Sequence, residues 1–163
     1  MRDAEDIVRQ IQAAFARAEY PGREALSNSH CCECAEVSGA YIDKLWTEIS
    51  LDDLLAGRET ALLTAVAWRY YLPAMMIWCL REPDAVDVIQ ENLVYQLEPP
   101  GEDHGVPEWF NERASGFSGD QRSAIAAYLD WSRERDDARW AGGKPPPNAA
   151  RALAHWTTDL RAG

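Results

Sequence analysis

Three of the four cysteines lie close together, in the segment His30-Cys31-Cys32-Glu33-Cys34. Cys31 and Cys34 form a C-x-x-C pair, and two thiolates at this spacing can bind one metal ion from a single tight turn. A structural zinc site needs four ligands, however, and the sequence has no second C-x-x-C and no H-x-x-x-H. Two interpretations stay open: zinc bound by Cys31, Cys34 and His30, or thiols without a metal at the start of a helix. A thioredoxin-like redox motif is disfavoured, because that motif follows a strand in a βαβ unit.

The acidic residues are concentrated in one segment. The chain has 163 residues and a formal net charge of −11, from 27 Asp and Glu against 16 Lys and Arg. Residues 82–112 contain nine of the acidic residues and no Lys or Arg, so the other 132 residues hold 18 acidic and 16 basic residues. On a helix with about 100° per residue, Asp84, Asp87 and Glu91 fall on one face. The opposite face is apolar and is predicted to pack in the core.

This acidic segment has two interpretations. Charge runs are usually the solvated side of a surface helix, but an unneutralised patch also attracts a basic protein. We predict a protein-binding module of the inhibitor or immunity type that meets a basic partner with this surface. The residues predicted to contact the partner are Asp84, Asp87, Glu91, Glu98, Glu102 and Asp103. The alternative function is a zinc-binding protein or a metal-dependent enzyme organised around Cys31 and Cys34.

Other functional classes find little support in the sequence. Nucleic acid is disfavoured as a partner, because a polyanion requires clustered Lys and Arg. The pair Gly143-Lys144 lacks the upstream glycine of a P-loop, and neither G-x-S-x-G nor H-E-x-x-H occurs. His104 is the best candidate for a general base, although a loop histidine without a catalytic role is the commoner case. We therefore favour a protein without enzymatic activity and without a cofactor, apart from the zinc considered above.

Apolar residues recur every three or four positions, and no segment alternates as a strand does, which predicts an all-α fold. A first helix is expected with Asp3 as its N-cap, Ile7, Ile11 and Phe15 on its buried face, and an end at Pro21-Gly22. We expect one irregular helical bundle that forms a single domain over residues 1–163.

A second helix is expected after the cysteine cluster, and its apolar face would consist of Val37, Tyr41, Leu45 and Ile49. Ser50 and Asp53 then form a variant capping box before a short helix that ends at Gly57. Later in the chain, Ser118 and Gln121 form a second capping box, which predicts the start of another helix.

Residues 59–81 are mostly apolar, and the part from residue 73 to residue 80 is apolar on every side, which predicts a helix in the middle of the bundle. Pro73 lacks a backbone N–H and would clash with the carbonyl of Arg69, so a kink or a helix boundary is expected there. An amphipathic helix is predicted over residues 84–97.

The C-terminal part is expected to contain a linker and a final helix. Residues 142–147 are rich in Gly and Pro, which is typical of a linker, and a helix is predicted from Asn148 to Arg161. Leu153, Trp156 and Leu160 would face the bundle.

The sequence predicts a soluble protein of the cytoplasm. The acidic N-terminus lacks the pattern of a secretory signal, and the longest apolar run, Leu72 to Leu80, has nine residues where a membrane span needs about 20. The clustered cysteines also differ from the dispersed cysteines of a secreted disulfide framework, so a reducing compartment suits them best.

Several of these residues resemble the pattern of a known family. The pattern consists of Trp46, the string Tyr70-Tyr71-Leu72-Pro73-Ala74, the helix start Phe117-Ser118 with Gln121, and Ala152-Leu153 before Trp156. In these residues the chain resembles an uncharacterised bacterial family of small soluble proteins, a domain of unknown function, from Ile7 to Trp156. Some members of that family also have a cysteine pair near the position of Cys31 and Cys34. The resemblance implies a bacterial, cytosolic, single-domain protein and assigns no catalytic residue.

Overall fold

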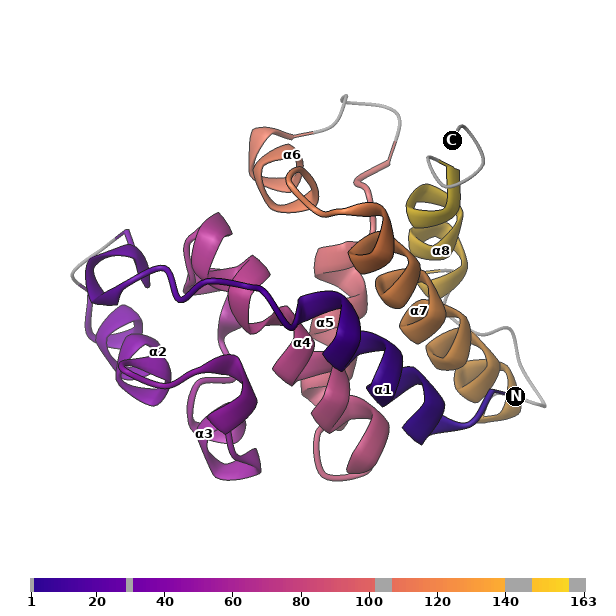
Figure 1. Cartoon of the computed structure of the whole chain (residues 1–163), viewed down its shortest axis with the longest axis horizontal. Helices are drawn as coiled ribbons and strands as arrows, with labels where there is room; N and C mark the ends of the chain where they lie inside the picture. Colours follow the sequence, from indigo (N-terminus) through magenta and orange to yellow (C-terminus); the bar gives the residue numbers. More distant parts are fainter. Residues whose placement is uncertain (1, 29–30, 102–106, 140–147, 159–163) are drawn as a thin grey trace.

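The computed structural model describes residues 2–28, 31–101, 107–139 and 148–158, and these residues form an all-α bundle (Figure 1). The α-helices are α1 (Ala4–Phe15), α2 (Cys32–Tyr41), α3 (Leu51–Ala56), α4 (Ala65–Arg81), α5 (Asp87–Leu97), α6 (Glu108–Ala114), α7 (Gly119–Arg139) and α8 (Asn148–Thr158). The short 3-10 helices are η1 (Arg23–Ala25), η2 (Trp46–Glu48) and η3 (Thr60–Leu62). No strand occurs among the described residues, so the predicted fold class is confirmed. The predicted linker at residues 142–147 lies outside them.

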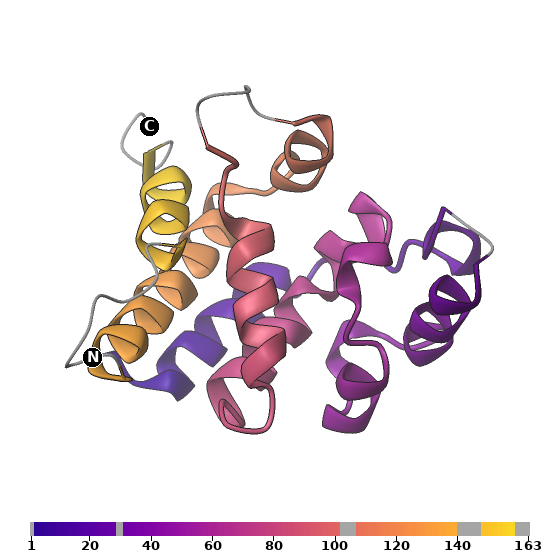
Figure 2. The same cartoon turned by 180° about the vertical axis from the view of Figure 1, so that it is seen from behind.

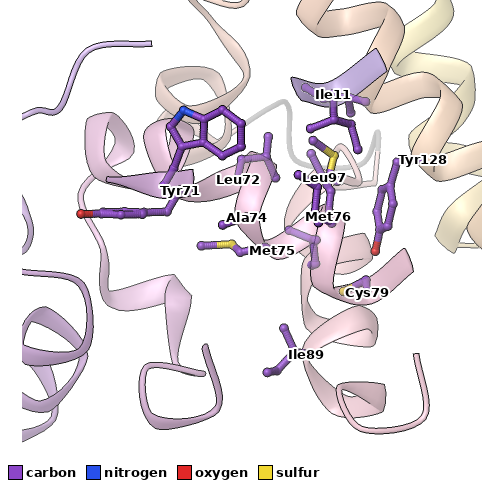
Figure 3. Packing of buried hydrophobic residues seen from close by; sticks show 14 of the residues in the cluster. Ile11, Tyr71, Leu72, Ala74, Met75, Met76, Cys79, Ile89, Leu97 and Tyr128 are labelled. Carbon is purple, nitrogen blue, oxygen red and sulfur yellow. The ribbon is translucent and has the colours of Figure 1, made fainter. Parts of the chain in front are cut away.

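The apolar helix α4 lies in the middle of the bundle, as predicted. Twelve of its 17 residues are buried, and α1, α5, α6 and η2 all pack against it. Figures 1 and 2 show α2 and α3 at one end of the molecule and α7 and α8 at the other, with α4 between them. In Figure 3, Ile11 of α1, Leu97 of α5 and Tyr128 of α7 gather around Met76 and Cys79 of α4. The core therefore joins helices that are far apart in the sequence.

Helix α4 continues through Pro73, so the predicted alternative of a helix boundary at this residue is wrong. A proline inside a helix costs about 3 kcal/mol, because one hydrogen bond is lost and the ring crowds the preceding turn. Burial of a single large apolar side chain contributes about 1.5–3 kcal/mol, and α4 buries several of them. Packing on all sides of the helix thus outweighs the local cost of Pro73.

The second helix is shorter than predicted. It ends at Tyr41, because the chain turns at Asp43, which has a positive φ of 57°. The predicted apolar face therefore does not continue to Leu45, whose side chain is 48% exposed. The hydroxyl of Tyr71 on α4 donates to the carbonyl oxygens of Tyr41 and Lys44, at 2.8 and 2.9 Å. These contacts replace helical hydrogen bonds, so a tertiary interaction ends α2.

The same stretch of α4 also positions η2. The hydroxyl of Tyr70 accepts a hydrogen bond from the backbone N–H of Trp46 at 3.3 Å. The indole N–H of Trp78 donates to the carbonyl oxygen of Ile49 at 2.8 Å. The string Tyr70-Tyr71-Leu72-Pro73-Ala74 therefore holds the connection between α2 and α3 on the core.

The predicted helix starts are confirmed where a local capping motif defines them. Asp3 caps α1, although α1 ends at Phe15, before the expected end at Pro21-Gly22. Ser50 and Asp53 form both hydrogen bonds of a capping box at α3, at 3.1 and 3.0 Å, and Gly57 is the C-cap residue. Short-range sequence patterns were sufficient at these positions, because both partners lie within one turn.

The later capping box behaves in the same way. Ser118 and Gln121 exchange hydrogen bonds of 3.0 and 3.2 Å at the start of α7.

Helix α8 begins at Asn148 as predicted, with Trp156 buried and Leu153 partly buried, whereas Leu160 lies outside the described residues. No helix among the described residues is both long enough and apolar enough to cross a membrane.

Candidate functional site

The cysteine cluster lies at the N-terminus of α2. Cys31 is the N-cap residue, and its Sγ accepts a hydrogen bond from the backbone N–H of Cys34 at 3.2 Å. The Sγ atoms of Cys31 and Cys34 are 2.7 Å apart. Cys34 is buried, whereas Cys31 and Cys32 are exposed. One helical turn therefore brings the two sulfurs of the C-x-x-C pair together.

A complete zinc site is not among the described residues. His30, the third predicted ligand, lies outside them, and no group of three His, Cys, Asp or Glu side chains within them is arranged to hold a metal ion. Burial raises the pKa of the Cys79 thiol to about 12, which makes that cysteine a poor ligand. The zinc site at Cys31, Cys34 and His30 stays a prediction.

The acidic segment does not begin with a helix at residue 84, and that part of the prediction is wrong. Helix α5 begins at Asp87 with Val86 as its N-cap, so Asp84 precedes the helix. Pro83 and Asp84 occupy the central positions of a turn, closed by a 3.0 Å hydrogen bond from the N–H of residue 85 to the carbonyl of residue 82. Proline favours this turn position because its φ is fixed. The predicted stripe of Asp84, Asp87 and Glu91 therefore does not share one helix.

Two of the predicted acidic contact residues form ion pairs with arginines of later helices. The carboxylate of Asp84 is fully exposed and lies 2.9 Å from the guanidinium of Arg135 on α7. Glu98 is buried and lies 2.9 Å from Arg151 on α8. Burial raises the pKa of Glu98, and the charge of Arg151 opposes this rise. Glu98 is therefore not part of an exposed acidic surface.

The remaining acidic positions are placed only in part. Glu91 is exposed on α5, whereas Glu102 and Asp103 lie outside the described residues, as does His104. Burial raises the pKa of Asp136 on α7, and the nearby negative charge of Glu91 adds to this rise. The positive charges of Arg135 and Arg139 oppose it. We use the name acidic patch for Asp84, Glu91 and Asp136, which lie on both sides of the contact between α5 and α7.

A pocket that the sequence analysis missed lies between η3, α5 and α6. Its volume is about 380 Å³, and its lining includes Arg58, Thr60, Tyr95, Gln96, Trp109 and Arg113. Pockets that bind small molecules typically have volumes of about 300–1,000 Å³ and combine aromatic walls with a few polar groups. The size and the lining of this pocket both fit that description.

Arg113 of α6 connects the segments that form the pocket. Its side chain is buried, and its guanidinium donates to Oε1 of Gln96 at 3.0 Å and to the carbonyl oxygens of Ala61 and Leu63 at 2.7 and 3.3 Å. Gln96 in turn donates to Oγ1 of Thr60 at 3.1 Å. This buried network fixes the position of the cation in the lining.

The charge of Arg113 has no acidic partner among the described residues. None of their carboxylates lies within ion-pair distance, and the guanidinium lies instead over the rings of Trp68 and Trp109, 5.3 and 5.9 Å from their centroids. Burial lowers the pKa of Arg113. Arg58 adds a second, exposed cation, whose nearest carboxylate oxygen is that of Glu59 at 3.8 Å. The pocket of this acidic protein is therefore lined by two arginines, one of them buried, and by one carboxylate, that of Glu59.

A second depression, of about 290 Å³, shares part of its lining with the pocket. Tyr95 and Trp109 belong to both, and their side chains are 63% and 41% exposed. Trp109 and Arg113 are four residues apart on α6, so they lie on one helix face. The sequence contained this spacing, but the ring of Trp109 becomes part of a pocket only because α5 and η3 pack beside α6.

Comparison with known proteins identifies a family to which the chain belongs, but no individual curated protein or solved structure that it matches. The model of DUF6714, described as a family of unknown function, matches residues 3–159. This match covers nearly the whole chain and agrees with the resemblance to an uncharacterised domain family. The chain belongs to the DUF6714 family.

Proposed function

We propose that this protein is a binding module and that the pocket between η3, α5 and α6 takes an anionic ligand with a planar ring. The observation that supports this most strongly is Arg113, a buried guanidinium in the pocket lining without a carboxylate partner among the described residues. The ligand class follows from the charge of the two arginines and from the exposed aromatic side chains beside them.

The charge argument begins from the cost of burial. A buried cation is unfavourable unless it is paired or fully hydrogen-bonded. A guanidinium has five N–H donors, and the contacts of Arg113 with Gln96, Ala61 and Leu63 use three of them. The two remaining N–H groups, on Nε and Nη1, can donate single charge-assisted hydrogen bonds to oxygens of an anion. An anion in the pocket would therefore balance a charge for which the described part of the chain supplies no carboxylate.

The aromatic argument concerns the rest of the ligand. Trp109 and Tyr95 are large side chains that remain 41% and 63% exposed at the edge of the pocket. Burial of aromatic surface is favourable, and rings pair in offset or edge-to-face arrangements. A flat ring next to the anionic group would cover Trp109 while its charged end reaches Arg58 and Arg113.

Phenyl phosphate is a suitable probe, because it combines a ring with an anionic group. We expect it to shift the indole resonance of Trp109 in an NMR titration and to bind more tightly than inorganic phosphate, which lacks the ring. Benzyl alcohol, which lacks the charge, should also bind more weakly. Equal affinities for phenyl phosphate and benzyl alcohol would contradict the role of the arginines.

Two matched variants localise the site. Arg58→Gln removes the exposed cation of the pocket and should weaken binding of phenyl phosphate about threefold to tenfold. Arg17→Gln makes the same change of charge at an exposed position away from the pocket lining and should leave the affinity unchanged. Equal affinities of the two variants would refute the proposed site, and circular dichroism checks that both are folded.

A second proposal concerns the acidic patch, which would bind a basic protein partner in the manner of an inhibitor or immunity protein. It is supported by the exposed carboxylates of Asp84 and Glu91 and by the net charge of −11. Arg135 neutralises part of this patch, so we expect a weaker and less salt-dependent interaction than the sequence alone suggested. The predicted cytoplasmic location and the predicted absence of a nucleic-acid partner belong to this proposal as well.

Charge reversal tests the second proposal. The double variant Asp84→Lys, Glu91→Lys reverses both exposed carboxylates of the acidic patch and should abolish capture of the basic partner from a lysate at low salt. The control, Glu36→Lys with Asp52→Lys, makes the same change of charge on exposed residues of α2 and α3, at the other end of the molecule (Figure 1). Unchanged capture by the first variant would eliminate the acidic patch as the interface.

A further inference from the structure

We propose that Cys31 and Cys34 are a reversible redox pair that forms an intramolecular disulfide at the N-terminus of α2. Their sulfurs are 2.7 Å apart, and the bond length of a disulfide is about 2.05 Å, so the two atoms need to approach by less than about 1 Å. Cys31 is the N-cap residue and Cys34 lies in the first turn of the ten-residue helix α2, which keeps this distance short without help from a distant segment.

The environments of the two thiols assign them different roles. Cys31 is exposed, so an external disulfide can reach its Sγ, which also accepts a hydrogen bond from the backbone N–H of Cys34 at 3.2 Å. We therefore assign Cys31, the accessible sulfur of the pair, as the group that attacks an external disulfide. Cys34 is buried beside it and is the resolving thiol.

With glutathione disulfide as the oxidant, the reaction has two balanced steps. The thiolate of Cys31 attacks one sulfur of glutathione disulfide, forms a mixed disulfide and releases one glutathione thiolate. The thiolate of Cys34 then attacks Sγ of Cys31, forms the intramolecular disulfide and releases the second glutathione. Two protein thiols are oxidised by loss of two protons and two electrons, and one glutathione disulfide is reduced to two glutathione thiols.

The other cysteines are poorly placed to compete. Cys32 is exposed, but adjacent side chains on a helix point about 100° apart and do not face each other. Cys79 is buried in α4, where its thiol has a pKa of about 12 and is almost entirely protonated at neutral pH. We therefore expect the disulfide between Cys31 and Cys34 to form in preference to one that includes Cys32 or Cys79.

The test uses the full chain, first reduced and freed of metal by a chelator. The protein is equilibrated in glutathione buffers of increasing oxidised fraction, quenched with iodoacetamide and analysed by mass spectrometry. We expect the oxidised form to incorporate two fewer alkyl groups than the reduced form, and a peptide map to link Cys31 to Cys34. Retention of all four alkylated cysteines in the most oxidising buffer, or a link that includes Cys32, would overturn the proposal.

Single substitutions test the two roles. Cys34→Ser removes the resolving thiol, so the reaction should stop with glutathione attached to Cys31. Cys32→Ser is the matched control at the neighbouring exposed cysteine and should still form the disulfide. Absence of the mixed disulfide in Cys34→Ser would contradict the assignment of Cys31 as the attacking thiol, and circular dichroism shows whether each variant keeps its helices.

Discussion

Removal of the Tyr71 hydroxyl tests how α4 holds the connection between α2 and η2. Tyr71 is fully buried, and its hydroxyl lies 2.8 Å from the carbonyl oxygen of Tyr41 and 2.9 Å from that of Lys44. The substitution Tyr71→Phe keeps the ring and its packing and removes only the O–H donor. The change therefore isolates one polar contact at the end of α2.

The expected loss of stability follows from the hydrogen bonds. One O–H has a single proton, so it provides one hydrogen bond that is shared between two acceptors. A net intramolecular hydrogen bond contributes about 0.5–1.5 kcal/mol, and a buried acceptor left without a partner costs about 1–3 kcal/mol. The carbonyl of Tyr41 retains a second donor, the N–H of Lys44 at 3.2 Å, which limits this cost. We expect Tyr71→Phe to lower the free energy of unfolding by about 1–2 kcal/mol.

Urea denaturation followed by circular dichroism measures this change. A loss of about 1–2 kcal/mol corresponds to a decrease in Tm of about 3–6 °C for a chain of this size. Burial raises the pKa of the Tyr71 phenol, so the hydroxyl stays protonated and the effect should be constant between about pH 6 and pH 9. The slope of the unfolding free energy against urea should not change, because the exposed area on unfolding is unaltered.

Tyr95→Phe is the matched control, since it removes the hydroxyl of a side chain that is 63% exposed. We expect its unfolding free energy to stay within about 0.5 kcal/mol of the wild type. If Tyr71→Phe were as stable as this control, the hydroxyl of Tyr71 would not hold the end of α2. The explanation for the short second helix would then be refuted.

Two further predictions concern the glycines near α2 and the buried carboxyl group. Gly57→Ala should destabilise the protein by about 1–3 kcal/mol, because a Cβ there would lie 2.5 Å from Cε2 of Tyr41. Gly39→Ala is the comparison: a Cβ at this helical position meets no atom within 4 Å, so the substitution should stabilise α2 by about 0.5–1 kcal/mol. Urea denaturation compares the pair, and equal effects would contradict the close packing of Gly57. Glu98→Gln should gain stability relative to the wild type as the pH rises above 4.5, because burial raises the pKa of Glu98 and its ionisation costs stability in the folded state. The gain should be small, since Arg151 offsets part of that cost, and a relative loss of stability between pH 4.5 and about pH 7 would disprove the reasoning.

Sequence patterns predicted the fold where the determining contacts are local. The capping boxes at Ser50 and Ser118 were identified because both partners lie three residues apart. The central position of α4 followed from its apolar residues on every side. The end of α2 was not predictable in this way, because the donor that replaces its last hydrogen bonds, Tyr71, lies 30 residues from Tyr41 in the sequence.

The candidate sites show the same division between local and distant contacts. The spacing of Cys31 and Cys34 indicated that one tight turn could present two thiols to a metal ion, and their sulfurs do lie 2.7 Å apart. The pocket was missed, because η3, α5 and α6 form it jointly and no motif links Arg58 to Arg113. The unneutralised charge of the acidic segment was overestimated from the sequence, since Arg135, which pairs with Asp84, is 51 residues away.

Pairing by distant arginines also changes what the net charge implies about partners. The charges of Asp84 and Glu98 are balanced in part by arginines of α7 and α8, whereas Arg113 keeps a positive charge without an acidic partner among the described residues. The net negative charge of the protein therefore repels anions at long range, whereas in our proposal the pocket attracts them at short range. Salt screens charges that are separated by more than about 10 Å at 0.1 M ionic strength. Added salt should therefore weaken the binding of a basic protein to the acidic patch. For an anion in the pocket, salt screens the long-range repulsion by the net charge and also part of the attraction to Arg58, so the two effects on its affinity oppose each other. The dependence of affinity on salt thus distinguishes a ligand of the pocket from a partner of the acidic patch.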